Sequence, residues 1–160
     1  MRPENIMAAP LTIDKWCSRN RLVVPPMVTW TASAEGLVSD YQLQHYASFK
    51  DVGMVVVEAT AVSPEGRLAA RQIGAFADEH LPGLTRLAKA IHEQGALAAI
   101  QLHHAGGNTT LEKTHGLPLL APSAITRNQD QAPPRAMDKA DIDRIQEDFA
   151  AAARRARDAG

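Results

Sequence analysis

The stretch Met54-Val55-Val56-Val57-Glu58-Ala59-Thr60 decides the fold of this chain, because an apolar run changes character at its C-terminal end. Two further runs do the same. Residues 21–24 lead into Pro25-Pro26-Met27-Val28-Thr29-Trp30, and residues 98–100 lead into Gln101-Leu102-His103-His104-Ala105-Gly106. Short continuous apolar runs are typical of parallel strands that are covered on both faces. Ligands of such sheets lie beyond the carboxyl ends of the strands, so the three junctions predict one side of one site.

Helical patterns alternate with these strands. Ser39 and Asp40 offer a cap for a first helix that Gly53 is expected to end, Gly95 is expected to close a second helix, and Asp138 should cap a third that ends at Gly160. Apolar residues at helical spacing predict the inner faces of these helices: Leu43, Tyr46 and Ala47, with Lys50, in the first; Leu84, Leu87, Ala88 and Ile91 in the second; Ile142, Ile145, Phe149, Ala152, Ala153 and Ala156 in the third.

The lengths of the connections choose between two α/β architectures. Long loops, residues 59–78 and 103–137, follow the second and third strands, whereas the connections before the strands are tight. A doubly wound sheet would usually carry a glycine-rich phosphate loop after its first strand, where this chain has Pro25, Pro26 and Met27. We therefore predict the N-terminal β/α units of a TIM (β/α)₈ barrel. The barrel is incomplete in this chain, because it needs at least ~200 residues.

Composition limits the function classes. The chain has 160 residues, 22% of them charged, and a net charge of −1, so nothing in it indicates a nucleic-acid or membrane-surface partner. Cys17 is the only cysteine, which rules out an internal disulfide and a cysteine-based metal cluster. The start of the chain, residues 1–5, contains an acid and a proline and has no apolar core behind it, so no secretory signal is expected. A cytoplasmic location is the default.

Five segments, in order, resemble the old yellow enzyme family of FMN-dependent oxidoreductases. They are residues 20–27 (NRLVVPPM), 57–62 (VEATAV), 100–106 (IQLHHAG), 120–125 (LAPSAI) and 134–137 (PRAM) with Asp141-Ile142 after them. The resemblance runs from about Leu11 to Gly160. It implies that residues 1–160 are the N-terminal portion of a single FMN-binding TIM-barrel domain.

The resemblance also implies an activity and a set of cofactor contacts. Such an enzyme takes hydride from NADH or NADPH and passes it through FMN to an activated alkene or a similar acceptor. By resemblance, the segment Pro25, Pro26, Met27 and Val28 lines the flavin, Ala59 lies against its ring, and Gln101 bonds its pyrimidine edge. A carboxamide suits that edge, because it both donates and accepts hydrogen bonds.

Two positions depart from the family pattern, and the catalytic groups have no counterpart. Relatives often have cysteine or threonine at the position of Val28, and a substrate-contacting tyrosine at that of Trp30. Trp30 keeps an aromatic wall on the expected substrate side but donates only through its indole N–H. The paired substrate-binding side chains, the arginine against the flavin and the phosphate loops of the family are all expected beyond Gly160.

Other polar residues are expected to have ordinary roles. Glu58 is interpreted as a structural acid that pairs with a neighbouring loop. His103 and His104 are adjacent on extended backbone, so their side chains point to opposite faces and no metal site is predicted. His45, His80, His92 and His115 are interpreted as surface or loop residues. Arg154, Arg155 and Arg157 are expected to complement the dipole of the last helix.

Two functions remain open from the sequence. The first is an NAD(P)H:flavin oxidoreductase of which this chain is the N-terminal part, with a complementing C-terminal half as its partner and a small-molecule substrate. The alternative is a catalytically inactive half-barrel remnant that self-associates and binds a flavin or a partner. The unpaired strand edges of an open barrel, which must pair with something, favour self-association in the second case.

Overall fold

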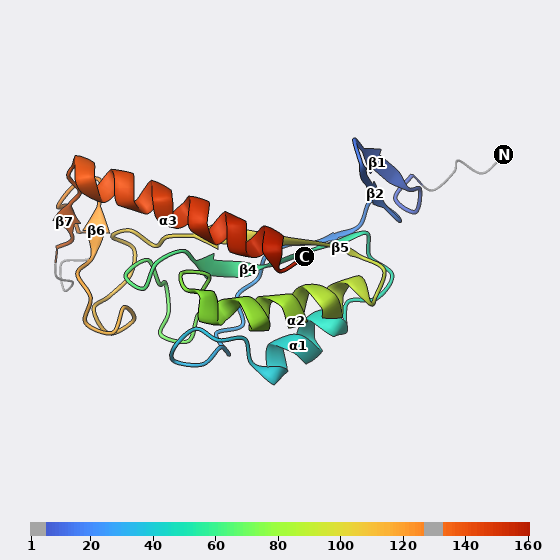
Figure 1. Ribbon diagram of the computed structural model, residues 1–160, viewed down its shortest axis with the longest axis horizontal. Coiled ribbons are helices and arrows are strands. Elements are labelled where there is room, and N and C mark those ends of the chain that lie inside the picture. Colours follow the sequence, from blue (N-terminus) through green and yellow to red (C-terminus); the bar gives the residue numbers. More distant parts are fainter. Residues whose placement is uncertain (1–5, 127–132) are drawn as a thin grey trace.

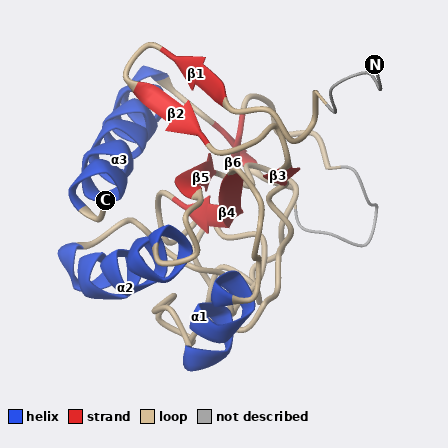
Figure 2. Cartoon of the chain, turned by 90° about the vertical axis from the view of Figure 1, so that its right-hand side faces the viewer, coloured by secondary structure: helices blue, strands red, loops and turns tan. Residues whose placement is uncertain are grey.

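The computed structural model describes residues 6–126 and 133–160, so the sequence-based expectation for residues 1–5 lies outside the described part. A three-stranded parallel sheet forms its centre, in the order β3 (Val23–Val24), β4 (Met54–Ala61) and β5 (Leu97–His103). The helices α1 (Asp40–Ala47), α2 (Leu81–His92) and α3 (Lys139–Asp158) lie on one side of this sheet (Figures 1 and 2). The predicted α/β fold with parallel strands is confirmed, and the sheet stays open.

The core lies between the sheet and the helices. Val55 and Val57 of β4 are buried, together with Leu84, Leu87 and Ile91 of α2. Alternate residues of a strand share a face, so the i, i+2 spacing of the two valines matches the helical stripe of α2 across the interface. Each fully buried side chain of this size contributes roughly 1.5–3 kcal/mol of transfer free energy, which is why the second helix forms as the sequence predicts.

The first helix begins as predicted but ends early. Ser39 is its N-cap and forms a capping box with Gln42. The helix ends at Ala47, because the backbone N–H and the hydroxyl of Ser48 both donate to the carbonyl of His45. Gly53, the expected terminator, has another role. A Cβ there would collide with the Ser18 hydroxyl, so glycine permits the close approach of a neighbouring strand.

That strand belongs to one of two small sheets that the sequence did not predict. β1 (Leu11–Ile13) and β2 (Trp16–Ser18) form an antiparallel hairpin, and β6 (Leu120–Ala121) pairs in parallel with β7 (Arg135–Ala136). Strands of two or three residues carry no readable alternation. A short 3₁₀ helix, η1 (Asp78–His80), precedes α2 and was also not predicted.

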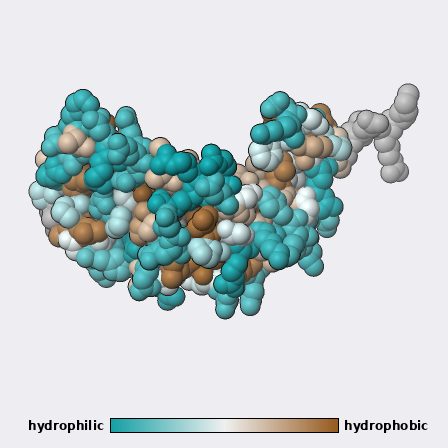
Figure 3. Space-filling view, viewed as in Figure 1, coloured by the Kyte–Doolittle hydropathy of each residue, from teal (hydrophilic) through white to brown (hydrophobic). Residues whose placement is uncertain are grey.

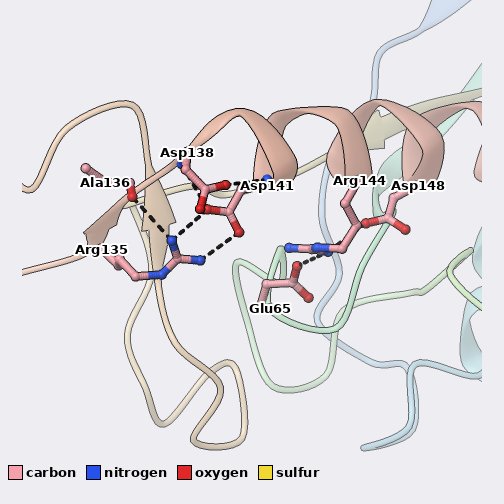
Figure 4. A network of polar contacts seen from close by, with 7 residues as sticks. All are labelled: Glu65, Arg135, Ala136, Asp138, Asp141, Arg144 and Asp148. Atoms are coloured by element: carbon pink, nitrogen blue, oxygen red, sulfur yellow. Dashed lines mark hydrogen bonds and ion pairs between the residues drawn. The ribbon is translucent and has the colours of Figure 1, made fainter.

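The third helix is capped as predicted, but part of its expected inner face is exposed. Asp138 is its N-cap and accepts a hydrogen bond from the backbone N–H of Asp141. On the expected inner face Ala152 is buried, but Ile142 is 44% exposed and Ala153 is also exposed, so these two assignments are wrong. The N-terminal half of α3 packs over loops rather than over the sheet, and polar contacts hold it there (Figure 4).

Polar contacts give Arg155 a role beyond the expected one at the helix end, and they correct the expected surface position of His80. Arg144 of α3 pairs with Glu65 of the loop after β4 at 2.7 Å and with Asp148 at 2.9 Å (Figure 4). Arg155 bonds the carboxylate of Asp78 and the carbonyl of Ala75, so it ties α3 to η1 in addition to lying at the helix end. His80, expected on the surface, is 1% exposed, because its ring packs against Phe76 and bonds the Ala77 and Glu35 carbonyls.

No helix in the described residues is both long enough and apolar enough to cross a membrane.

Candidate functional site

The carboxyl ends of β3, β4 and β5 meet at one edge of the sheet, because the three strands are parallel. Val24 is in register with Val55, and Val57 with Ile100. The hairpin β1–β2 lies at the opposite end, beside the start of β4 (Figure 1). The structure therefore brings together the predicted site residues from the three junctions: residues 25–28 after β3, Ala59 in β4 and Gln101 in β5.

A β-bulge lies at this edge. The register passes from Val57 opposite Ile100 to Thr60 opposite Leu102, so Glu58 and Ala59 together face Gln101. Bulges bend a strand locally, re-aim its side chains and are over-represented next to binding sites. Ala59 and Gln101, singled out separately in the sequence, are thereby cross-strand neighbours.

Gln101 lies on the sheet face that the helices leave open. Ala98, Ile100 and Leu102 pack against the core. Strand alternation then directs Gln101 and His103 to the other face, and the side chain of Gln101 is exposed. None of the hydrogen bonds found among the described residues uses its carboxamide, which is therefore available to a ligand.

The residues after β3 offer apolar surface at the same edge. Met27 is 55% exposed and Val28 37%, Pro25 is exposed, and Pro26 is half-buried. Ala59 is more enclosed, at 5% exposure, and its carbonyl accepts a hydrogen bond from Gln72 at 2.8 Å.

Trp30, the expected substrate-side wall, has an unusual backbone. Its φ is +54°, in the left-handed region that disfavours side chains with a Cβ, and it is 37% exposed. A tryptophan held in this conformation beside a candidate site indicates a local constraint. No pattern in the sequence predicts this conformation.

Glu58 is fully buried and makes the structural pairing expected of it. Its carboxylate accepts hydrogen bonds from the backbone N–H and the hydroxyl of Thr29, each at 2.8 Å, and from the Gln42 carboxamide at 3.1 Å. The backbone N–H of Glu58 donates to the hydroxyl of Tyr46. Burial raises the pKa of that phenol, so Tyr46 stays a neutral donor and acceptor. The sequence did not indicate Thr29, Gln42 or Tyr46 as its partners, because Thr29 lies in the loop after β3 and the other two lie in α1, all distant from Glu58 along the chain.

Two adjacent histidines, His103 at the end of β5 and His104 after it, are partly buried. Burial lowers the pKa of both His103 and His104. The Nδ1 atom of His104 accepts a hydrogen bond from the backbone N–H of Gly106. Nδ1 of His103 and Nε2 of His104 are buried and have no hydrogen-bond partner among the described residues. Across residues 6–126 and 133–160, no group of three or more His, Cys, Asp or Glu side chains is arranged to hold a metal ion.

Two arginines in the loop after β4 are bound to backbone carbonyls. Arg67, only 5% exposed, donates to the carbonyls of Ala34 and Glu35, and Arg71 donates to the carbonyl of Ala32. These contacts pin the loop after β3 to the loop after β4. They engage both terminal nitrogens of Arg67 and the Nε of Arg71.

A comparison with known protein families covers nearly the whole chain. Residues 7–160 match the NADH:flavin oxidoreductase / NADH oxidase family. The chain belongs to this family. It is 38% identical over 151 residues to an NADPH dehydrogenase of Clostridium acetobutylicum, and the match covers 93% of this chain and 44% of that protein. It is also 38% identical over 160 residues to an NADPH dehydrogenase of a Geobacillus species, where the match covers 98% of this chain and 46% of that protein.

Solved structures superpose on nearly the whole of this chain with less than half of their own length. Morphinone reductase aligns with a TM-score of 0.87 at 26% identity, over 96% of this chain and 45% of that one. The Old Yellow Enzyme from Pichia sp. AKU4542 aligns with a TM-score of 0.87 at 25% identity, over 94% of this chain and 42% of that one. The chain thus spans less than half the length of the relatives that it matches, and its open sheet corresponds to the N-terminal part of their TIM barrel.

Proposed function

We propose that this chain forms the flavin-facing strand ends of an FMN-dependent oxidoreductase, which transfers hydride from NADH or NADPH to an activated alkene or a similar acceptor. Membership of the NADH:flavin oxidoreductase family supports the reaction class, and two relatives named NADPH dehydrogenase support the hydride donor. When bound, FMN would accept and pass on the hydride.

One observation carries the proposal. The exposed Gln101 carboxamide lies opposite the bulge at Ala59, on the open face of the sheet. The pyrimidine edge of a flavin presents donors and acceptors side by side, and a carboxamide complements both. The residues present therefore fit the ring system.

The remaining site residues have complementary roles in this proposal. Pro25, Pro26, Met27 and Val28 offer carbonyl groups and apolar surface to a flat ring, and the small side chain of Ala59 leaves room for the ring above the bulge. Trp30 forms an aromatic wall on the substrate side. The catalytic groups come from residues other than these.

The phosphate of FMN has no comparable partner among the described strand-end residues, since both terminal nitrogens of Arg67 donate to backbone carbonyls and Arg71 is held to the Ala32 carbonyl through its Nε. We expect a complementing polypeptide that carries the later barrel strands to supply the phosphate site and the catalytic pair.

Mixing the chain with such a polypeptide, taken from the C-terminal part of a relative, tests the proposal. We expect a flavin absorbance band to co-purify with the complex and NADPH to be oxidised in the presence of an enone. The chain alone should do neither efficiently. A complex that forms but neither binds flavin nor oxidises NADPH would contradict the proposal.

A second candidate is a half-barrel that self-associates without turnover. Leu22 and Val23 at the edge strand β3 are 41% and 55% exposed, and free strand edges invite pairing. An apolar hollow of about 540 Å³ also opens between the end of α3 and the hairpin β1–β2, where it is lined by Trp16, Leu87, Ile100, Ala156 and Gly160 (Figure 3). A colourless, stable homodimer in sedimentation experiments would favour this candidate over the first.

A further inference from the structure

A buried carboxylate lies directly behind the residues that follow β3. Glu58 has no exposed surface, and both of its oxygens accept hydrogen bonds. Oε2 accepts from the backbone N–H of Thr29, and Oε1 accepts from the Thr29 hydroxyl and from Gln42. The Thr31 hydroxyl lies 2.9 Å from that of Thr29 and extends the network along the chain. One carboxylate therefore fixes both the backbone and the side chain of Thr29.

The next residue along the chain is the strained one. Trp30 has a φ of +54°, and the chain is clamped on both sides of it. Thr29 is held by Glu58. Ala32, which is fully buried, exchanges two hydrogen bonds with Arg71 across the loop after β4. A backbone outlier persists where its surroundings over-determine it, and such outliers cluster at functional sites.

We infer that Glu58 is a positioning residue, which holds Trp30 in its left-handed conformation through Thr29 and so sets the place of the indole beside the strand ends. A carboxylate suits this role, because Thr29 and Gln42 present only donors to it and it can accept from all of them. An amide at the same position would turn an NH₂ group toward one of these donors. The importance of the indole position for the reaction rests on the proposed function, but the positioning itself does not.

The test uses Glu58→Gln in a Trp16→Phe background, which leaves Trp30 as the only tryptophan. We expect the near-ultraviolet circular dichroism of Trp30 to fall by at least about half, and exchange of the Thr29 amide hydrogen to quicken about tenfold or more, because the bond protecting it is lost. Protection of the β4–β5 hydrogen bonds should persist. Thr114→Val, which removes hydrogen bonds of another fully buried side chain far along the chain, is the matched control and should leave both signals unchanged.

Two further variants decide the matter if Glu58→Gln lowers overall stability. Thr29→Val keeps the shape and the backbone N–H but removes the hydroxyl bond, and should also weaken the Trp30 signal. Trp30→Gly removes the strain, so Glu58→Gln should lower the melting temperature less in that background than in the parent. An unchanged Thr29 exchange rate and Trp30 spectrum in Glu58→Gln, or an equal loss of protection throughout β4 and β5, would overturn the inference.

These measurements need no flavin. A chain that passes them but whose complemented complex binds no FMN would contradict the proposed function and leave the role of Glu58 intact.

Discussion

At the end of β5, Gln101 is a polar side chain exposed on a face that the helices do not cover. Its neighbours along the strand, Ile100 and Leu102, pack against the core, and the bulge at Ala59 lies across from it. Gln101 therefore lies on the open face and opposite the register shift in the β4–β5 pairing.

We expect Gln101→Leu to lower FMN affinity of the complemented protein about tenfold or more. Leucine has a similar size but leaves polar flavin atoms unpaired, which costs about 1–3 kcal/mol. Fluorescence titration measures the change. Gln44→Leu, at an exposed position of α1, is the matched control and should leave affinity unchanged. Equal affinities of the Gln101 and Gln44 variants would remove Gln101 from the site.

Acidification provides a second test at the residue scale. Burial lowers the pKa of His103 and His104, so near pH 6 the unfolded chain binds protons that the folded chain does not. The stability linked to these two histidines is therefore complete above about pH 6.5 and decreases as the pH falls below that value. Urea unfolding between pH 7.5 and 5 should show this decrease.

The double variant His103→Gln, His104→Gln should have a shallower dependence of stability on pH over the same range, because glutamine does not titrate there. An identical slope in the parent and the double variant would mean that the two histidines do not account for the decrease.

The helices show how local signals act at the scale of the element. Asp138 caps α3, and the Asp141 carboxylate bonds back to the Asp138 backbone and is held in a two-pronged pair by Arg135 (Figure 4). The hydrogen bonds from Arg135, which have the largest effect, and the one from the Asp138 backbone lower the pKa of the Asp141 carboxyl to about 2. The start of α3 is thus fixed by polar contacts where its apolar face is exposed.

Asp138→Ala should lower the free energy of unfolding by about 1 kcal/mol, because it removes the N-cap acceptor. Chemical denaturation measures the loss. Asp143→Ala breaks only an exposed i, i+4 pair with Lys139 and should cost no more than about 0.5 kcal/mol. A larger loss for Asp143→Ala than for Asp138→Ala would contradict the capping account.

At the scale of the whole molecule, three parallel strands and three helices form one open side of a barrel. The residues of the proposed flavin site gather at one edge, while Arg67 and Arg71 of the loop after β4 donate to backbone carbonyls. Under the proposed function, this edge would therefore offer contacts to a flavin ring but few to its phosphate.

The chain without a complementing partner should bind FMN and riboflavin with affinities within about threefold of each other, since a phosphate that stays in water contributes less than ~1 kcal/mol. Titrating each flavin against its fluorescence measures the ratio. Adding the complementing polypeptide should shift the ratio strongly toward FMN. A chain that by itself prefers FMN about a hundredfold would show that it contains a phosphate site.

The sequence by itself determined the alternation of strands and helices, the caps at Ser39 and Asp138, the buried stripe of α2, and the three junctions that carry the candidate site. These features are local: apolar periodicity, capping residues and short motifs are read within one turn or one strand.

Only the tertiary structure decided the bulge opposite Gln101, the left-handed Trp30 and the anchoring of Thr29 by Glu58. It also decided the burial of His80 and the exposure of Ile142, together with the hairpin β1–β2. Each of these depends on which distant segment packs against the residue. Glu58 and Thr29 are 29 positions apart in the chain and meet only because parallel strands bring their carboxyl ends to one edge.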